Sequence, residues 1–213
     1  MASIGRGIPQ IVNQEVLCEV CRALEQSGIV YIPFFGTLLG IIRDGNVICG
    51  DDDVDIYCPL EDSMTVTKVM IELGFLKSLD DTPYFTQFTK QRGEHTVPVD
   101  FYFYTETDEK ILDRWNFLGR PFEDEKMMEI PKDIIFPLNK LDFFEVKINI
   151  PYNPPAVLFF LYGKDWRIKM AKKRDYRMMI KNGSPRLVRL SRYERFRISI
   201  KYLLRSLKNK LKT

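Results

Sequence analysis

The sequence predicts a mixed α/β fold over residues 1–166, followed by a basic extension over residues 167–213. Three observations support this prediction. Segments with apolar residues three or four positions apart, typical of amphipathic helices, are interspersed with short apolar runs typical of strands. One of these runs, residues 53–57, alternates acidic with apolar side chains, as a strand with one buried face does. The length of 213 residues and the apolar fraction of 45% suit one compact domain with an appendage.

The first half of the chain is expected to contain two amphipathic helices and a short helical turn that precedes the acidic residues. Asn13 is expected to cap the first helix, and Gly28 follows its end. The short helical turn opens at Gly36-Thr37 and ends at Arg43. The expected helices are residues 13–27 and 61–73, and the expected strands are residues 29–35, 53–57, 75–79 and 84–90.

The second half is expected to begin with a clear strand, TVPVDFYFYT, in which Asp100 and two tyrosines alternate with apolar residues. A hairpin with its turn near Asn139-Lys140 follows, and then a short helix ended by Gly163. A long helix with one apolar stripe is expected in the basic extension. The expected ranges are residues 96–105 for the strand, 133–150 for the hairpin, 154–162 for the short helix and 186–211 for the long helix.

Four acidic residues stand within five positions at the start of the acidic strand: Asp51, Asp52, Asp53 and Asp55. Period-two alternation places the last two on one face of the strand and their apolar neighbours on the other. Adjacent carboxylates repel each other and remain ionised together when a cation lies between them. Asp100 lies within an apolar strand and needs a partner, which a metal shared with Asp53 and Asp55 would supply. The pattern therefore predicts a divalent-metal site.

A solvated acidic turn and a calcium-binding EF-hand loop are the alternatives. The alternation, the upstream Gly-Thr and the downstream Asp100 make the solvated turn less favoured. An EF-hand loop needs glycine at its sixth position and glutamate at its twelfth, and this chain has Ile56 and Asp62 there. The EF-hand is therefore rejected.

A site of this kind suits phosphoryl transfer assisted by Mg²⁺ or Mn²⁺. The Gly36-Thr37 turn offers backbone N–H groups and a hydroxyl to a phosphate. Arg43, about a turn and a half along the same helix, could bind the same phosphate, although a surface arginine is the alternative. Either Asp100 or His95, the single histidine, could accept the proton of an attacking hydroxyl.

The net charge of +3 conceals an uneven distribution. From residue 164 to the end there are 18 Lys/Arg and three acids, while the rest of the chain has 14 Lys/Arg and 26 acids. The basic extension could dock on the domain, lie on an anionic membrane or bind nucleic acid, of which nucleic acid is the least favoured. Without a long apolar run or a signal-peptide core, we expect a cytoplasmic protein, with peripheral contact at the inner face of the membrane left open.

The stretch FGTLLGIIRDGNVICGDDDVDIY resembles the signature of the LicD/fukutin family, whose members belong to the nucleotidyltransferase-fold superfamily. That superfamily combines a Gly-Gly or Gly-Ser/Thr turn, an Asp-x-Asp/Glu pair and a third acid on a later strand. Residues 129–166 resemble the family's C-terminal signature, which ends in a Tyr-Gly-x-Asp/Glu-Trp/Tyr motif, here residues 162–166. The resemblance, which covers roughly residues 30–166, implies a nucleotidyltransferase-like mixed sheet flanked by helices.

This resemblance implies transfer of a phospho-alcohol, such as phosphocholine or a polyol phosphate, from a CDP-linked donor to a sugar hydroxyl of a surface glycan or glycolipid. Magnesium would be the cofactor and CMP the leaving group. The family's metal ligands carry over to Asp53, Asp55 and Asp100, with Asp51 or Asp52 as a further or outer ligand. The chain departs from the family pattern at Cys49-Gly50, where Pro-Trp is common, and this departure leaves the donor's identity open.

Two other functions are kept as alternatives. A true nucleotidyltransferase would attach a nucleotide to its substrate and release pyrophosphate instead of CMP. A non-catalytic protein that binds RNA or an anionic surface could retain the fold without using its carboxylates. The presence of all three carboxylates argues against the non-catalytic alternative.

Overall fold

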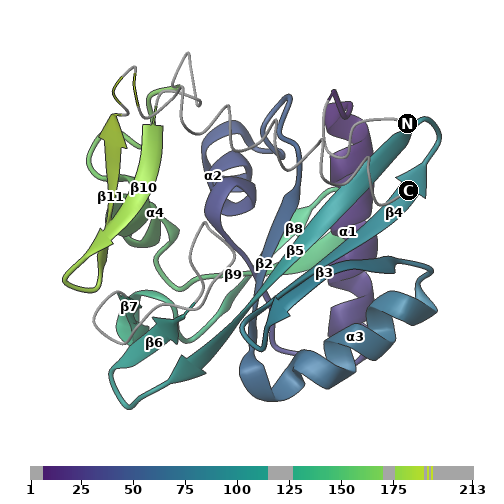
Figure 1. The fold of residues 1–213 in the computed structure, drawn as a ribbon, viewed down its shortest axis with the longest axis horizontal. Helices are drawn as coiled ribbons and strands as arrows, with labels where there is room; N and C mark the ends of the chain where they lie inside the picture. The colour runs from purple at the N-terminus through teal and green to yellow at the C-terminus, as the bar shows by residue number, and fades with distance from the viewer. Residues whose placement is uncertain (1–6, 115–126, 170–175, 190, 192, 194–213) are drawn as a thin grey trace.

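The fold is taken from a computed structural model that describes residues 7–114, 127–169, 176–189, 191 and 193. Its centre is a seven-stranded sheet with the spatial order β1-β2-β5-β4-β3, to which β6 and β7 are added beyond the end of β5 (Figure 1). The expected mixed sheet is confirmed, because β2 and β5 pair in parallel while the other pairs are antiparallel. The strands are β1 (Ile32–Pro33), β2 (Val54–Pro59), β3 (Leu76–Thr82), β4 (Phe85–Arg92), β5 (His95–Glu106), β6 (Lys110–Asp113) and β7 (Met128–Pro131).

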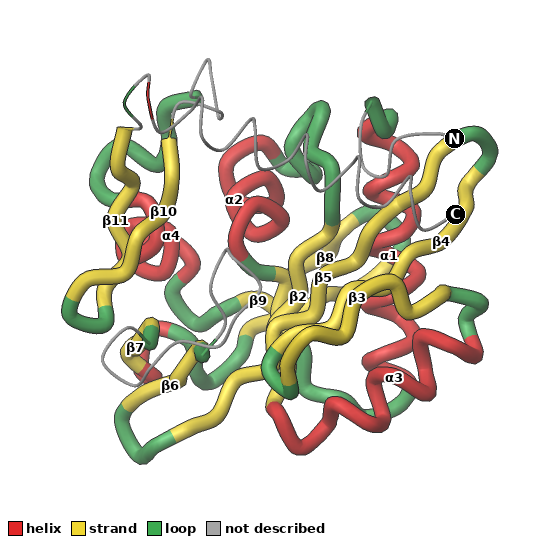
Figure 2. The backbone as a smooth tube through the Cα atoms, in the orientation of Figure 1, coloured by secondary structure: helices red, strands yellow, loops and turns green. Residues whose placement is uncertain are grey.

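Helices cover both faces of this sheet, as Figure 2 shows. Apolar residues of α1 and α3 pack on the face that carries the odd-numbered valines and phenylalanines of β5. Apolar residues of α2 and α4 pack on the opposite face, against the tyrosines of β2 and β5. The period-two prediction for both strands is therefore confirmed. The helices are α1 (Gln10–Gln26), α2 (Phe35–Asp44), α3 (Ser63–Glu72) and α4 (Pro154–Tyr162), and two short 3₁₀ turns lie at Leu60–Asp62 and Lys132–Ile134.

The start of α1 differs from the prediction. The helix begins at Gln10 after Pro9, so Asn13 lies inside it, is buried, and does not cap it. The strand expected over residues 29–35 is also shorter, because α2 already begins at Phe35. Within the described part of the chain, no helix combines the length and apolar character needed to cross a membrane.

Two hairpins lie outside the central sheet. The first, β8 (Asn139–Phe143) with β9 (Val146–Ile150), packs against α1. Its turn lies at Phe144 and Glu145, so the turn predicted at Asn139-Lys140 is wrong. Asn139 instead pairs with Ile150 at the open end of the hairpin.

The second hairpin, β10 (Tyr176–Lys181) with β11 (Ser184–Arg189), occupies the start of the basic extension. The helix predicted from residue 186 is therefore wrong over residues 186–189, which form β11. The cause is an Asn182-Gly183 turn in which both residues have positive φ, the most favoured two-residue hairpin turn. The hairpin lies beside α4 and β7, and the Glu129 N–H donates to the Gly183 carbonyl. The rest of the predicted helix, apart from positions 191 and 193, lies outside the described residues.

Candidate active site

The parallel pairing of β2 and β5 brings the predicted acids together. Asp55 lies opposite Asp100 in this pairing, and Asp53 immediately precedes β2. One carboxylate oxygen from each of Asp53, Asp55 and Asp100 lies within 4.8 Å of the others. Asp55 and Asp100 are 7% and 8% exposed, so both charges are largely removed from solvent. This arrangement of three carboxylates could hold a divalent cation.

Asp100 is the acid whose protonation is most perturbed. Burial raises its pKa from 3.8 to about 6, although a hydrogen bond from the Gln87 amide at 2.8 Å partly opposes the rise; the charge of Asp52 makes a smaller contribution in the same direction as burial. In the metal-free protein Asp100 is therefore mainly ionised at neutral pH but holds a proton below about pH 6. A bound divalent cation would favour the ionised form instead, because it supplies the missing positive charge.

A second acidic group adjoins the first. Carboxylate oxygens of Asp51, Asp52 and Asp53 also lie within 4.8 Å of one another, so Asp53 belongs to both groups. Asp51 is buried and Asp52 is exposed. The buried position of Asp51 makes it better placed than Asp52 to contribute to a site inside the protein.

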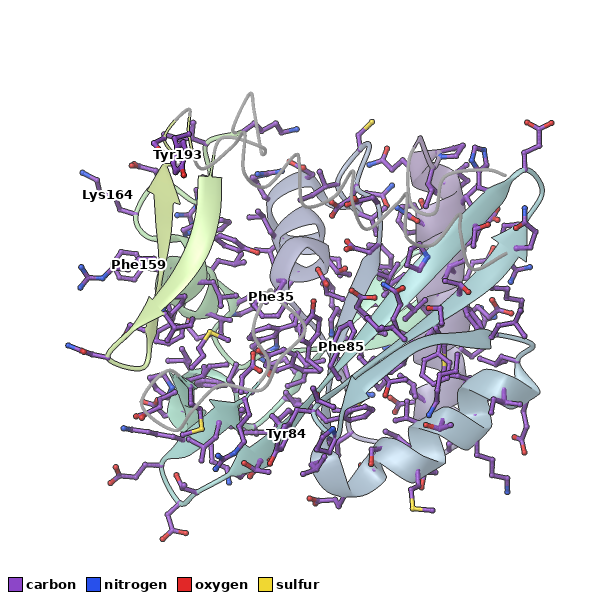
Figure 3. The ribbon with its side chains drawn as sticks, in the orientation of Figure 1. Phe35, Tyr84, Phe85, Phe159, Lys164 and Tyr193 are labelled. Atoms are coloured by element: carbon purple, nitrogen blue, oxygen red, sulfur yellow. The ribbon has the colours of Figure 1, made fainter. Side chains whose placement is uncertain are left out.

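The start of α2 holds Asp55 directly. The Gly36 N–H donates to Asp55 Oδ2 at 3.2 Å, and Thr37 Oγ1 accepts a hydrogen bond from the Asp55 N–H at 2.8 Å. Phe35, just before them, has a positive φ of 42° that a non-glycine residue seldom adopts. Its ring, labelled in Figure 3, lies in the interior of the protein. It makes edge-to-face contacts with Phe34, Tyr57 and Tyr102, which stabilise this conformation. Gly36 and Thr37, predicted to bind phosphate, therefore position a predicted metal ligand in this structure.

Two glycines allow the acidic loop to lie directly against α2. A Cβ on Gly36 would lie 2.9 Å from Asp51 Oδ2, and a Cβ on Gly40 would lie 2.6 Å from the Asn46 carbonyl oxygen. Both distances are shorter than side chains tolerate. The loop from Asn46 to Asp51 can thus approach the helix only because these positions lack side chains.

Three amide side chains of α1 hold the other side of the same loop. Gln10 donates to the Val47 carbonyl at 2.6 Å, and Asn13 donates to the Asp51 carbonyl at 2.9 Å. Gln14 accepts from the Asn46 amide at 3.0 Å. Sequence reasoning missed this role, although the amides at positions 10, 13 and 14 share one face of a helix whose neighbouring residues are buried.

The two remaining predicted site residues are Arg43 and His95, and the structure places them differently with respect to the acids. Arg43 lies seven residues after Gly36, on the same face of α2 and about 10 Å along its axis. Its guanidinium makes two hydrogen bonds to Asp44, at 3.0 and 2.8 Å. His95 opens β5 opposite Arg92, five residues or about 16 Å before Asp100, and alternation places it on the other face. The structure therefore does not bring His95 together with the acids.

The profile of the LicD/FKTN/FKRP nucleotidyltransferase domain matches residues 28–153, which include all the acids described above. The chain belongs to this family. No curated protein sequence matches it significantly.

Solved structures support the fold of this LicD/FKTN/FKRP domain. The lincosamide antibiotic adenylyltransferase LnuA, solved with lincomycin bound, is 14% identical, with a TM-score of 0.50 over 69% of this chain and 84% of that chain. A candidate nucleotidyltransferase from Thermotoga maritima is 15% identical, with a TM-score of 0.41 over 71% of this chain and 86% of that one. ANT(2'')-Ia in complex with adenylyl-2''-tobramycin is 16% identical, with a TM-score of 0.36 over 56% and 69%. The family match and the likeness to LnuA together show the nucleotidyltransferase-like fold.

Family membership indicates that the protein is a transferase. The clustered carboxylates of this LicD/FKTN/FKRP domain are oxygen ligands of the kind that hard divalent cations prefer. They lie at the start of β2, in the middle of the parallel strand β5 and against the N-terminal end of a helix, in a region partly shielded from water. Such a site can hold phosphate oxygens through a cation and neutralise negative charge that develops during transfer.

Proposed function

We propose that this protein transfers a phospho-alcohol from a CDP-linked donor to a hydroxyl of a glycan or glycolipid. Phosphocholine or a polyol phosphate would be the transferred group, and CMP would be released. The observation that carries this proposal is the meeting of Asp53, Asp55 and Asp100 within a LicD/FKTN/FKRP domain. These three residues would hold Mg²⁺ or Mn²⁺, with Asp51 as a further ligand, and the cation would neutralise charge on the donor's phosphates.

Asp100 is the preferred proton acceptor. In the metal-free protein its pKa of about 6 leaves it mainly ionised at neutral pH, and a bound cation would favour the ionised form further, so it can accept a proton. Gln87 occupies Oδ1, so Oδ2 would take the proton from the acceptor hydroxyl. The hydroxyl oxygen would then bond to phosphorus as the bond from phosphorus to the CMP oxygen breaks. Arg43 would bind the donor's phosphates with the guanidinium N–H groups that Asp44 does not use.

Calorimetric titration of the donor classes tests this proposal. We would titrate CDP-choline, CDP-glycerol, CDP-ribitol, CTP and ATP into the protein, with and without Mg²⁺. Mg²⁺-dependent binding of one CDP-alcohol, lost in Asp53→Asn while the variant keeps its circular dichroism spectrum, is the expected result. Turnover that survives Asp53→Asn would contradict the site assignment.

Nucleotidyl transfer is the second candidate, and the similarity of fold to the adenylyltransferase LnuA favours it. The two candidates differ in their products. Release of CMP from a CDP-alcohol supports phospho-alcohol transfer, whereas release of pyrophosphate from CTP or ATP supports nucleotidyl transfer. A preference for a triphosphate in the titration would therefore replace the first proposal with the second.

A further inference from the structure

The function proposed above leaves the Tyr-Gly-x-Asp-Trp motif at residues 162–166 without a role. Tyr162 is the last residue of α4, and Gly163, with a φ of 79°, ends the helix there. Trp166 is buried in the cluster formed by α2, α4 and the tyrosine-bearing face of the sheet. The motif therefore lies on the same face of the sheet as Asp55 and Asp100.

Tyr162 lies near both charged parts of the site, the acids and Arg43. Helix α4 packs against α2, beside which it lies in Figures 1 and 2. The Tyr162 side chain packs against the cluster that contains Phe35 and Tyr102. Four charged side chains near its hydroxyl act on it electrostatically. They are the carboxylates of Asp51, Asp53 and Asp55 and the guanidinium of Arg43. Tyr162 thus lies in the vicinity of the acids near the start of α2 and of the arginine near its end.

The segment after Tyr162 is fastened to the same helix. Lys169 Nζ lies 3.1 Å from Asp44 Oδ1, and Asp44 is the residue that binds Arg43. The hydrogen bonds from Arg43 lower the pKa of Asp44, which keeps this carboxylate ionised between the two cations. With Trp166 buried and Lys169 paired, the segment that follows α4 is anchored at two points.

We propose that Tyr162 is a substrate-binding residue whose hydroxyl donates a hydrogen bond to a phosphate oxygen held between the acidic group and Arg43. This inference rests on the proposed function. Burial raises the pKa of Tyr162 well above its ordinary value, and the nearby carboxylates raise it further, so the phenol stays protonated. A neutral O–H donor suits this position because it can bind a phosphate without competing for the cation.

The test compares Tyr162→Phe with Tyr104→Phe, which makes the same chemical change in the same cluster. The carboxylates that act on the Tyr104 hydroxyl are Glu106, Glu61 and Asp62, and none of the proposed metal ligands is among them. Binding of CDP-choline and of pyrophosphate to the Mn²⁺-loaded protein would be measured by calorimetry. Loss of a hydrogen bond to a charged group should weaken both in Tyr162→Phe by roughly 10- to 100-fold. Mn²⁺ affinity in both variants, and both ligands in Tyr104→Phe, should stay within about twofold of wild type.

The two probes separate the possible failures. Equal binding of both probes by wild type and Tyr162→Phe overturns the role of Tyr162. If wild type binds pyrophosphate but not CDP-choline, and Tyr162→Phe weakens pyrophosphate, the role of Tyr162 is supported while CDP-choline is removed as the donor. If wild type binds neither probe in the presence of Mn²⁺, both the phosphate site and the role of Tyr162 are overturned.

Discussion

The pKa of a side chain at this site depends more on its surroundings in the fold than on its neighbours in the sequence. Asp100 follows Val99 and precedes Phe101, and its pKa of about 6 results from burial across the strand pair. The effect of this pKa shift on the stability of the folded state follows from the linkage between proton binding and folding. A carboxyl whose pKa is raised from 3.8 on folding gives the folded state stability that is fully present below pH 3.8 and is lost as the pH rises through about 6. The shift corresponds to about 3 kcal/mol.

Asp100→Asn should remove this pH-dependent loss of stability. In EDTA at pH 7.5, where wild type carries the buried charge, the variant should melt roughly 6–12 °C higher than wild type. At pH 4 the two should differ much less, because Asp100 is then protonated and resembles asparagine. Gln87 can donate to the carboxyl oxygen of aspartate and to the amide oxygen of asparagine. A difference in melting temperature that does not change between the two pH values would show that burial of Asp100 is not the cause.

At the scale of elements, the site is a loop held between two helices. Helix α1 holds it by hydrogen bonds from amide side chains, and α2 holds it by the close approach that Gly36 and Gly40 permit. A side chain added at each of the two glycines would meet a different kind of atom. A side chain on Gly36 would meet the carboxylate of Asp51, which can rotate, whereas a side chain on Gly40 would meet backbone atoms at 2.6 and 2.7 Å, which cannot.

Gly36→Ala should therefore mainly affect metal binding, and Gly40→Ala should mainly affect stability. Gly36→Ala should weaken Mn²⁺ binding by about tenfold with a small change in stability, because alanine's helix propensity offsets part of the strain. Gly40→Ala should lower the free energy of unfolding by at least about 2 kcal/mol, since the loop must move away from the helix. Calorimetric Mn²⁺ titration and urea unfolding of each variant measure the two effects. Similar losses of stability in both variants would contradict this division.

Patterns within single segments predicted most of the elements and the meeting of the three acids. Alternation in two strands places Asp53, Asp55 and Asp100 on one face, where their carboxylates do lie together, while their role as metal ligands stays a prediction. Features that depend on contacts between segments were missed. Asn13 reads as a helix cap in isolation, and its bond to the Asp51 carbonyl exists only because the loop folds back on α1. For the hairpin β10–β11 the dipeptide Asn182-Gly183 is a local indication of a two-residue turn. The helical spacing of apolar residues beyond it favoured a helix from residue 186 instead.

For the molecule as a whole, charge is divided between the acidic domain and the basic end of the chain. Residues 192–213 carry eight Lys/Arg and one acid. An anionic bilayer attracts such a segment by roughly 1 kcal/mol for each basic residue near the surface. Membrane contact, one of the alternatives that the sequence leaves open for this segment beside docking and nucleic-acid binding, can be tested without disturbing β11, which ends at Arg189.

Deletion of residues 192–213 should reduce sedimentation with phosphatidylserine vesicles at least tenfold and leave the far-ultraviolet circular dichroism of the domain in place. Binding of the full chain should also fall as salt is raised from 0.1 to 1 M, because the Debye length shortens. Phosphatidylcholine vesicles serve as the uncharged control. Unchanged sedimentation of the truncated protein, while it stays folded, would rule out anchoring through this segment.

The parallel pairing of β2 with β5 also determines when the site can exist. Asp55 and Asp100 are neighbours in the sheet but forty-five positions apart in the chain, with α3 and the β3–β4 hairpin between them. Contacts of such long sequence separation are slow to form, because the intervening chain must first be ordered. The two proposed ligands are therefore far apart in the unfolded chain, and a cation at the proposed site would bind the finished sheet. By mass action, such a cation would stabilise the completed fold without guiding its early steps.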